Sequence, residues 1–176
     1  LKPERANTLV LGAVLQPTSN LNFAVDYYSI KINGAIRAIG GANAVEQCNL
    51  SNQTSPICSF VTRDPVTQAV TRTLTAPFNL TQQKARGIDF EGRWRMPLGG
   101  GSDKLTLRVL GSYAIQNLVA SPLIANPVDD IGNLISQSAA CSSPRWRVTG
   151  TVNYEHGPFT AYLQTRYIGA FTWDKT

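Results

Sequence analysis

Short turns and long polar stretches alternate along this chain, and this rhythm constrains the fold more than any single motif. Turn sequences rich in Gly, Pro, Asn and Ser occur at 16–20, 97–104 and 156–158, as tight hairpins require. Two long polar stretches, at about 37–80 and 116–143, separate these hairpins from one another. Soluble domains rarely carry connections of that length without a structure or a function of their own.

The segment 87–96, GIDFEGRWRM, shows the period-2 alternation of a β-strand. Charged residues occupy one set of positions: Asp89, Glu91, Arg93 and Arg95. Apolar residues or glycine occupy the other set: Ile88, Phe90, Gly92, Trp94 and Met96. A soluble sheet turns such an apolar stripe toward a core, whereas a membrane barrel turns it toward lipid. The alternation alone does not separate the two interpretations, because both have a period of two.

The order of turns and loops favours the barrel, because outer-membrane barrels alternate short turns on one side with long loops on the other. In the strand expected at about 20–32 the apolar positions change phase near Tyr27 and Tyr28, which suggests a bulge. The expected fold is all-β: an antiparallel up-and-down meander forming part of a transmembrane β-barrel, with two long external loops. Its strands are expected at about 6–15, 20–32, 84–96, 104–115, 145–155 and 159–168.

Four stretches of the chain resemble a known family. They are LKPE at the start, NLNFAVDYYSIKINGAI (20–36), KARGIDFEGRW (84–94) and SPRWRVTGTVNYEHGPFTAYLQTRYIG (143–169). Together they resemble the C-terminal part of the β-barrel of TonB-dependent outer-membrane receptors. The resemblance implies a location in the bacterial outer membrane, a 22-stranded barrel, an N-terminal plug domain and ligand uptake driven by TonB. We expect residues 1–176 to be a segment of one barrel domain, with the plug domain absent from it.

Two functions follow as hypotheses. The first is a barrel-wall segment of an active-transport receptor that imports a scarce solute, such as a ferric siderophore, cobalamin or a saccharide. Its expected partners are outer-membrane lipid, the plug domain of the same parent chain and the TonB energy-coupling complex; the extracellular ligand is unknown. The alternative is a soluble secreted β-sandwich or adhesin-like binding module with long recognition loops. A Greek-key strand order would favour this second hypothesis.

A set of charged residues is expected to face the barrel lumen, where water can solvate the charged groups. Its members are Asp89, Glu91, Arg93, Arg95, Arg108, Arg145, Arg147 and Arg166. The arginines could pair with carboxylates of other strands and of the plug, or attract an acidic ligand through their positive potential. We favour pairing, and within 89–95 an ion-pair ladder over a pair of catalytic carboxylates.

The residue types argue against an enzyme. His156 is the single histidine and lies in the HGP turn, which argues against a histidine-based metal cluster or catalytic triad. No cofactor and no metal site is expected. The net charge of +5 comes without a block of five like charges, so nucleic acid is not an expected partner.

The cysteines suggest one disulfide. Cys48 and Cys58 lie ten residues apart in the first long stretch. A bond between them would stabilise an otherwise flexible external loop, and an oxidising compartment permits it. The alternative is a pair of free thiols without a role. Cys141, in the second long stretch, has no evident partner.

Overall fold

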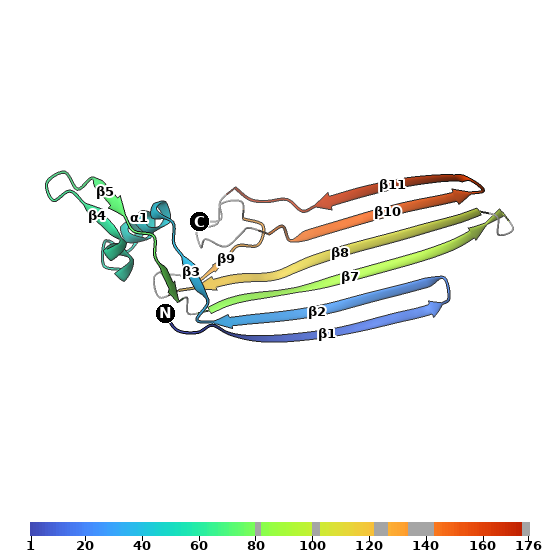
Figure 1. The fold of residues 1–176 in the computed structure, drawn as a ribbon, viewed down its shortest axis with the longest axis horizontal. Helices are drawn as coiled ribbons and strands as arrows, with labels where there is room; N and C mark the ends of the chain where they lie inside the picture. The colour runs from blue at the N-terminus through green and yellow to red at the C-terminus, as the bar shows by residue number, and fades with distance from the viewer. Residues whose placement is uncertain (80–81, 100–102, 122–126, 134–142, 174–176) are drawn as a thin grey trace.

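The computed structural model describes residues 1–79, 82–99, 103–121, 127–133 and 143–173. Six long strands lie side by side in one sheet, and the short β9 (Val128–Asp129) adds to β8 (Figure 1). The long strands are β1 (Arg5–Thr18), β2 (Leu21–Asn33), β7 (Gln82–Leu98), β8 (Asp103–Ala120), β10 (Trp146–His156) and β11 (Phe159–Ile168).

The six long strands form an antiparallel up-and-down meander, as expected. Their order in the sheet is β1-β2-β7-β8-β10-β11, so each long strand pairs with the next long strand along the chain. The three tight connections lie at one end of the sheet, and the two long connections lie at the other (Figure 1). We call these the turn end and the loop end. The Greek-key order that would favour a sandwich is not found among the described strands.

Three strands extend further than the alternation of apolar residues predicts, and the first of them, β1, runs on to Thr18, where 15 is the expected end. β7 begins at Gln82 rather than at 84, and β8 runs on to Ala120, where 115 was the expected end. Their backbone pairing continues from Leu98↔Asp103 to Gln82↔Ala120 across one irregularity between Arg86 and Gly87. A ladder of backbone hydrogen bonds does not need apolar side chains. The strands therefore continue beyond the residues whose alternating side chains predicted them.

The strand register divides the sheet into an apolar face and a polar face. Opposite residues of antiparallel neighbours share a face, and residues two apart along a strand do as well. The pairs Phe90↔Gly111 and Gly111↔Val148 therefore place these residues on the apolar face. The same rule assigns to the apolar face Leu9, Leu11, Leu15, Leu21, Phe23, Val25, Tyr27, Ile88, Trp94, Met96, Leu105, Leu107, Val109, Tyr113, Trp146, Val152, Tyr154, Phe159, Leu163 and Tyr167.

Toward the loop end, apolar side chains occur on the face that is polar elsewhere, and polar side chains occur on the face that is apolar elsewhere. Along β2, Tyr27 on the apolar face is followed on the same face by Ser29 and Lys31, while Ile30 and Ile32 lie on the opposite face. The bulge expected near Tyr27 is wrong, because β2 pairs with β7 in unbroken register from Leu21 to Asn33. The change of phase in the sequence therefore marks a change of surroundings and not a change of backbone.

A small core explains the apolar residues on the other face at the loop end. Val119 of β8 and Ala35 are buried together there, with Ile32 and Phe78 packed against them. Phe78 belongs to the first long connection, so this contact attaches the connection to the sheet. Ile32 therefore packs against protein on this face of the sheet, whereas Lys31 lies on the opposite face.

The first long connection is folded, in contrast to the flexible loop that its composition suggested. A second buried cluster, made by Ile39, Ala44, Cys48 and Ile57, forms its centre. The elements around this cluster are β3 (Ile36–Ala38), α1 (Gly41–Leu50), η1 (Pro56–Phe60), β4 (Val61–Arg63), β5 (Val70–Thr73) and β6 (Pro77–Asn79). Strand β3 pairs with β6, and β4 pairs with β5 as a hairpin that projects away from the sheet (Figure 1).

None of the described helices has the length and hydropathy that crossing a membrane would require.

Glycine and aromatic residues interlock in the middle of the apolar face. The ring of Phe90 lies across Gly111 on the neighbouring strand, where a Cβ atom would come within 2.0 Å of the ring. The same ring meets Trp146 edge to face, with centroids 6.5 Å apart. Aromatic residues that cover cross-strand glycines help to hold register in β-sheets. This contact therefore joins β7, β8 and β10.

We expect Gly111→Ala to lower the free energy of unfolding by about 1–3 kcal/mol, because the added methyl group forces the Phe90 ring away. Denaturant unfolding measures the change. Gly40→Ala is the matched control, since a Cβ there meets no atom within 4 Å and its φ of −67° suits alanine. Equal losses in the two variants would contradict the interlock, whereas recovery by Phe90→Leu in the Gly111→Ala background would support it.

Candidate functional site on the polar face of the sheet

The register places most of the predicted charged residues on the polar face. Asp89, Glu91, Arg93 and Arg95 alternate along β7 with the apolar residues. Arg93 lies opposite Arg108 of β8, and Ser112 of β8 lies between Asp89 and Arg147 of β10. Arg166 of β11 lies opposite Thr149, two residues along β10 from Arg147. Seven of the eight predicted residues thus share this face.

Arg145 is the exception. It lies in a bend directly before β10, and its carbonyl oxygen accepts a hydrogen bond of 2.9 Å from the N–H of Ala114. Its guanidinium lies 5.9 Å from the centroid of the Tyr113 ring. That ring contacts Trp146 on the apolar face, at a centroid distance of 4.5 Å. The side chain of Arg145 is therefore placed beside the apolar face, because strict alternation begins only with the strand.

Negative and positive side chains occupy different positions along the strands of the polar face. Three carboxylates lie near the middle: Asp26 of β2 stands opposite Asp89, and Glu91 follows two residues further along β7. Toward the turn end the charges on this face are mostly positive: Arg93, Arg95, Lys104 and Arg108. Asp26 is missing from the predicted set. Its position opposite Asp89 depends on the register between β2 and β7, which the pattern of single strands does not reveal.

The expected ion-pair ladder within 89–95 is replaced by a pair between strands. Glu91 Oε1 accepts a hydrogen bond from Arg108 Nε at 2.7 Å, and both side chains are more than 40% exposed. Residues two apart on one strand stand about 7 Å apart, whereas side chains on adjacent strands lie closer. Exposed pairs of this kind contribute about 0.2–1 kcal/mol. This pair therefore orients Arg108 more than it stabilises the fold.

A shallow hollow lies over the middle of the polar face. Its volume is about 370 Å³, and Asp26, Asp89, Glu91, Ser112 and Arg147 are among the residues that line it. Clefts of about 300 Å³ and more are large enough to hold a small ligand or a protruding side chain. The lining carries both signs of charge, so the hollow is suited to a polar or zwitterionic partner.

The single histidine, His156, lies at the turn end of the sheet beside Asp103. Among the described residues, no three His, Cys, Asp or Glu side chains gather where they could bind a metal ion. His156 ends β10 and contacts Asp103 Oδ1 at 2.6 Å across the sheet. Asp103 Oδ2 also accepts a hydrogen bond of 2.9 Å from the Tyr154 hydroxyl. These contacts tie together the start of β8 and the end of β10.

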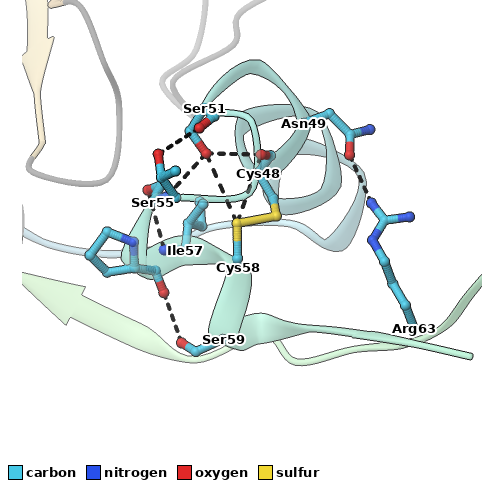
Figure 2. The surroundings of a disulfide bond; sticks show 10 residues. Cys48, Asn49, Ser51, Ser55, Ile57, Cys58, Ser59 and Arg63 are labelled. Atoms are coloured by element: carbon cyan, nitrogen blue, oxygen red, sulfur yellow. Dashed lines mark hydrogen bonds between the residues drawn. A yellow bond between two sulfur atoms is a disulfide. The ribbon is translucent and has the colours of Figure 1, made fainter. Parts of the chain in front are cut away.

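The two cysteines of the first long connection are bonded to each other. Cys48 of α1 and Cys58 of η1 form a disulfide, with their Cα atoms 5.0 Å apart (Figure 2). Beside it, the hydroxyl of Ser51 donates to the carbonyl oxygen of Cys48 at 2.8 Å. Arg63 Nη2 donates to Asn49 Oδ1 at 2.8 Å and so connects β4 to α1. Cys141 lies outside the described residues.

The hairpin tip between β4 and β5 is closed by a carboxylate. Asp64 Oδ1 accepts hydrogen bonds from the N–H and hydroxyl groups of Thr67 and from the N–H of Val66. These bonds, with that from the Thr67 N–H the largest cause, hold the pKa of Asp64 below its ordinary value. Ionised Asp64 therefore supports the turn at neutral pH, and this support is lost only as the pH falls through the lowered pKa.

The comparison with known protein families decides what this sheet belongs to. The family model described as TonB dependent receptor-like, beta-barrel, matches residues 1–176, which is the whole chain. The chain belongs to the TonB-dependent receptor β-barrel family. A search of curated proteins and a search of solved structures each found no match.

Membership of the TonB-dependent receptor family confirms the resemblance in the four sequence stretches. Members of this family are receptors and transporters of the bacterial outer membrane rather than enzymes. The sheet is accordingly part of a transmembrane β-barrel, left open among the described residues at the outer edges of β1 and β11. The family also implies a lipid environment, and a plug domain and TonB as partners of the parent receptor.

Reduction of the disulfide should loosen the first long connection without opening the sheet. Closing a loop of about ten residues contributes about 2–3 kcal/mol, and the sheet itself contains neither cysteine. Hydrogen exchange of residues 34–79, compared with and without a reducing agent, measures the effect. A Cys48→Ser/Cys58→Ser variant is the control and should not respond to the reductant. Unchanged exchange in the reduced wild-type protein would show that the buried cluster suffices without the bond.

Proposed function

We propose that this chain forms part of the barrel wall of a receptor that imports a scarce solute across the outer membrane with energy supplied through TonB. The apolar face contacts lipid, and the polar face lines the lumen around the plug domain of the parent chain. The solute classes that fit such a receptor are a ferric siderophore, cobalamin or a saccharide. Support comes from the family match and from the dimensions of the apolar face.

The observation that carries this proposal is the length of the apolar band. On β10 it runs from Trp146 to Tyr154, nine residues, which is the length that a tilted strand needs to cross a hydrocarbon layer. Tyr113 lies opposite Trp146 at the loop end of the band, and Leu105 lies opposite Tyr154 at the turn end. Aromatic rings at both ends suit the two interfacial girdles of an outer-membrane barrel.

The lengths of the connections support an orientation of the sheet in the membrane. Barrels of this kind place short turns in the periplasm and long loops outside the cell, so the loop end is proposed to be extracellular. The folded connection between β2 and β7 then lies outside, where its disulfide is chemically suited to the oxidising surroundings. Ligand contacts are expected in this connection and in the one between β8 and β10, because binding residues concentrate in loops.

The sorted charges of the polar face suit contacts with a plug domain. The hollow beside Asp26 and Asp89 offers carboxylates to basic or amide groups, and the side chains of Arg93 and Arg95 offer positive charge near the periplasmic turns. Arg93 Nε is buried without a hydrogen-bond acceptor among the described residues. A plug that supplies acceptors at this level would satisfy it.

The soluble β-sandwich has no support in the structure. A sandwich needs a second sheet packed about 10 Å from the first, and no described segment covers the apolar face between the turn end and Trp146. Large apolar side chains there stay open, such as Leu11 at 62% exposed and Leu163 at 60%. In water, an open apolar surface of this extent would promote aggregation. In a bilayer it is the favourable arrangement.

The proposal is tested by placing arginine at different depths of the sheet in the complete receptor. Val109 lies midway along the apolar band, between Gly92 and Gly150. Val109→Arg should lower the free energy of unfolding by about 2–4 kcal/mol, the cost of a charge near the bilayer midplane. Ser112→Arg should cost much less, because the polar face is hydrated there. Folding titrations in lipid vesicles measure both.

Phe159→Arg separates lipid from a protein core. Phe159 is 59% exposed at the turn end of the apolar face, opposite His156. A charge near the interface costs about 0–1 kcal/mol in a membrane, whereas loss of a packed phenylalanine in a protein core costs about 3–5 kcal/mol. Equal penalties at Val109 and Phe159 would defeat the assignment of the apolar face to lipid.

A further inference from the structure

Beyond the loop-end edge of the apolar band, the same surface of the sheet becomes basic. Lys84 and Arg86 follow Ile88 on its face of β7, and Lys31 of β2 stands directly opposite Lys84. Arg5 of β1 lies on the same face, two residues along the strand from Asn7, which is opposite Lys31. Arg145 joins them from the bend before β10, beside Tyr113. We call Arg5, Lys31, Lys84, Arg86 and Arg145 the rim cluster.

No ion pair within the described part of the chain neutralises the rim cluster. The ammonium groups of Lys31 and Lys84 make no hydrogen bond or ion pair with any residue that the structure describes, and only the backbones of these residues take part in the strand pairing. Arg86 Nη2 donates to the neutral Gln116, and Arg86 Nε has no acceptor among the described residues. Like charges opposite one another on neighbouring strands are destabilising. An arrangement of this kind is favourable when an anion lies between the side chains.

Strand pairing places one carboxylate on the same surface as the rim cluster among the described residues. It belongs to Asp129 of β9, which lies opposite Leu118, one strand beyond Lys84. Its Oδ1 already accepts hydrogen bonds from the backbone N–H groups of Asn117 and Ile131. Asp129 is therefore engaged with its own connection, and the centre of the rim cluster stays positive.

The position of the rim cluster matches the headgroup layer of a membrane. Arg86 and Lys84 lie two and four residues beyond Ile88, which is about 7 and 13 Å along the strand. The headgroup regions occupy the 5–8 Å or so on either side of the roughly 30 Å hydrocarbon core, and a tilted strand shortens the vertical distance. The cluster is also continuous with the aromatic girdle formed by Tyr113 and Trp146.

We propose that the rim cluster is a binding site for the phosphate group of an anionic lipid in the outer leaflet. Lys31, Lys84 and Arg86 would share one phosphate through charge-assisted hydrogen bonds, and Arg145 would add a second positive contact along the girdle. The acyl chains would lie against the apolar face below. This inference rests on the proposed function in one respect: the apolar face must contact lipid.

The test compares lipid binding by charge-matched variants of the complete receptor. The rim variant is Lys31→Gln/Lys84→Gln/Arg86→Gln, and the control is Lys2→Gln/Arg72→Gln/Lys104→Gln, which removes the same charge elsewhere. Both are reconstituted in phosphatidylcholine nanodiscs containing a minor fraction of phosphatidylglycerol. Native mass spectrometry then counts the phosphatidylglycerol molecules retained. Each basic residue near a charged membrane surface strengthens binding by about fivefold.

We expect the rim variant to bind phosphatidylglycerol at least about tenfold more weakly than the wild type and the control, and we expect the wild-type binding to weaken with added salt. Equal retention in the rim variant and the wild type would overturn the proposal, and so would equal loss in the control. Inorganic phosphate that binds the wild type in detergent, without lipid, and is lost in the rim variant would assign the site to free phosphate instead.

The two proposals fail in distinguishable ways. If Val109→Arg carries the midplane penalty but the rim variant retains its phosphatidylglycerol, only the rim site is wrong. If Val109 and Phe159 respond alike to arginine, the lipid-facing assignment fails before the rim is tested. Insertion of the rim variant is checked by the protease resistance of its strands in vesicles, so misfolding is recognised as such.

Discussion

The arrangement of this chain depends on one constraint: backbone N–H and C=O groups cannot stay unpaired in a hydrocarbon layer. The antiparallel ladder runs from β1 to β11 with only local irregularities at Leu15–Thr18 and Arg86–Gly87, and it meets that constraint because each long strand supplies partners to the next. Once the ladder is complete, the side chains are free to suit different surroundings on the two faces. The apolar band and the charged polar face are both consequences of one pleated backbone.

The same ladder continues through a change of environment. At the level of Ile88 and Tyr113 the apolar band ends, yet the strands run on to Gln82 and Ala120. Above that level Val119 packs against the folded connection on one face, and the basic residues of the rim cluster occupy the other. The sheet therefore joins a membrane-spanning wall to a small protein core. That core, together with the disulfide, holds the long connection in a defined conformation.

Much of the fold could be predicted from local patterns. Turn residues and alternation located all six long strands, and they predicted the facing of Asp89 and Glu91. Two predictions are wrong because they depend on which residues surround a strand in space, and a local sequence pattern carries no information about that. The phase change at Tyr27 was interpreted as a bulge, because a pattern does not distinguish a shifted backbone from a changed environment. The alternation does not extend to Arg145, because this residue lies in the bend before β10 begins.

The sequence by itself determined the period of two, the tight turns, the candidate cysteine pair and the family. These are properties of neighbouring residues or of motifs, and they persist whatever lies beside each strand. The tertiary structure decided which charges meet: Asp26 opposite Asp89, Lys31 opposite Lys84, and Arg108 bonded to Glu91. A single cross-strand pair contributes only about 0.2–1 kcal/mol, too little to set the register. The sum of the ladder, the turns and the packing sets it, and distant residues become neighbours as a result.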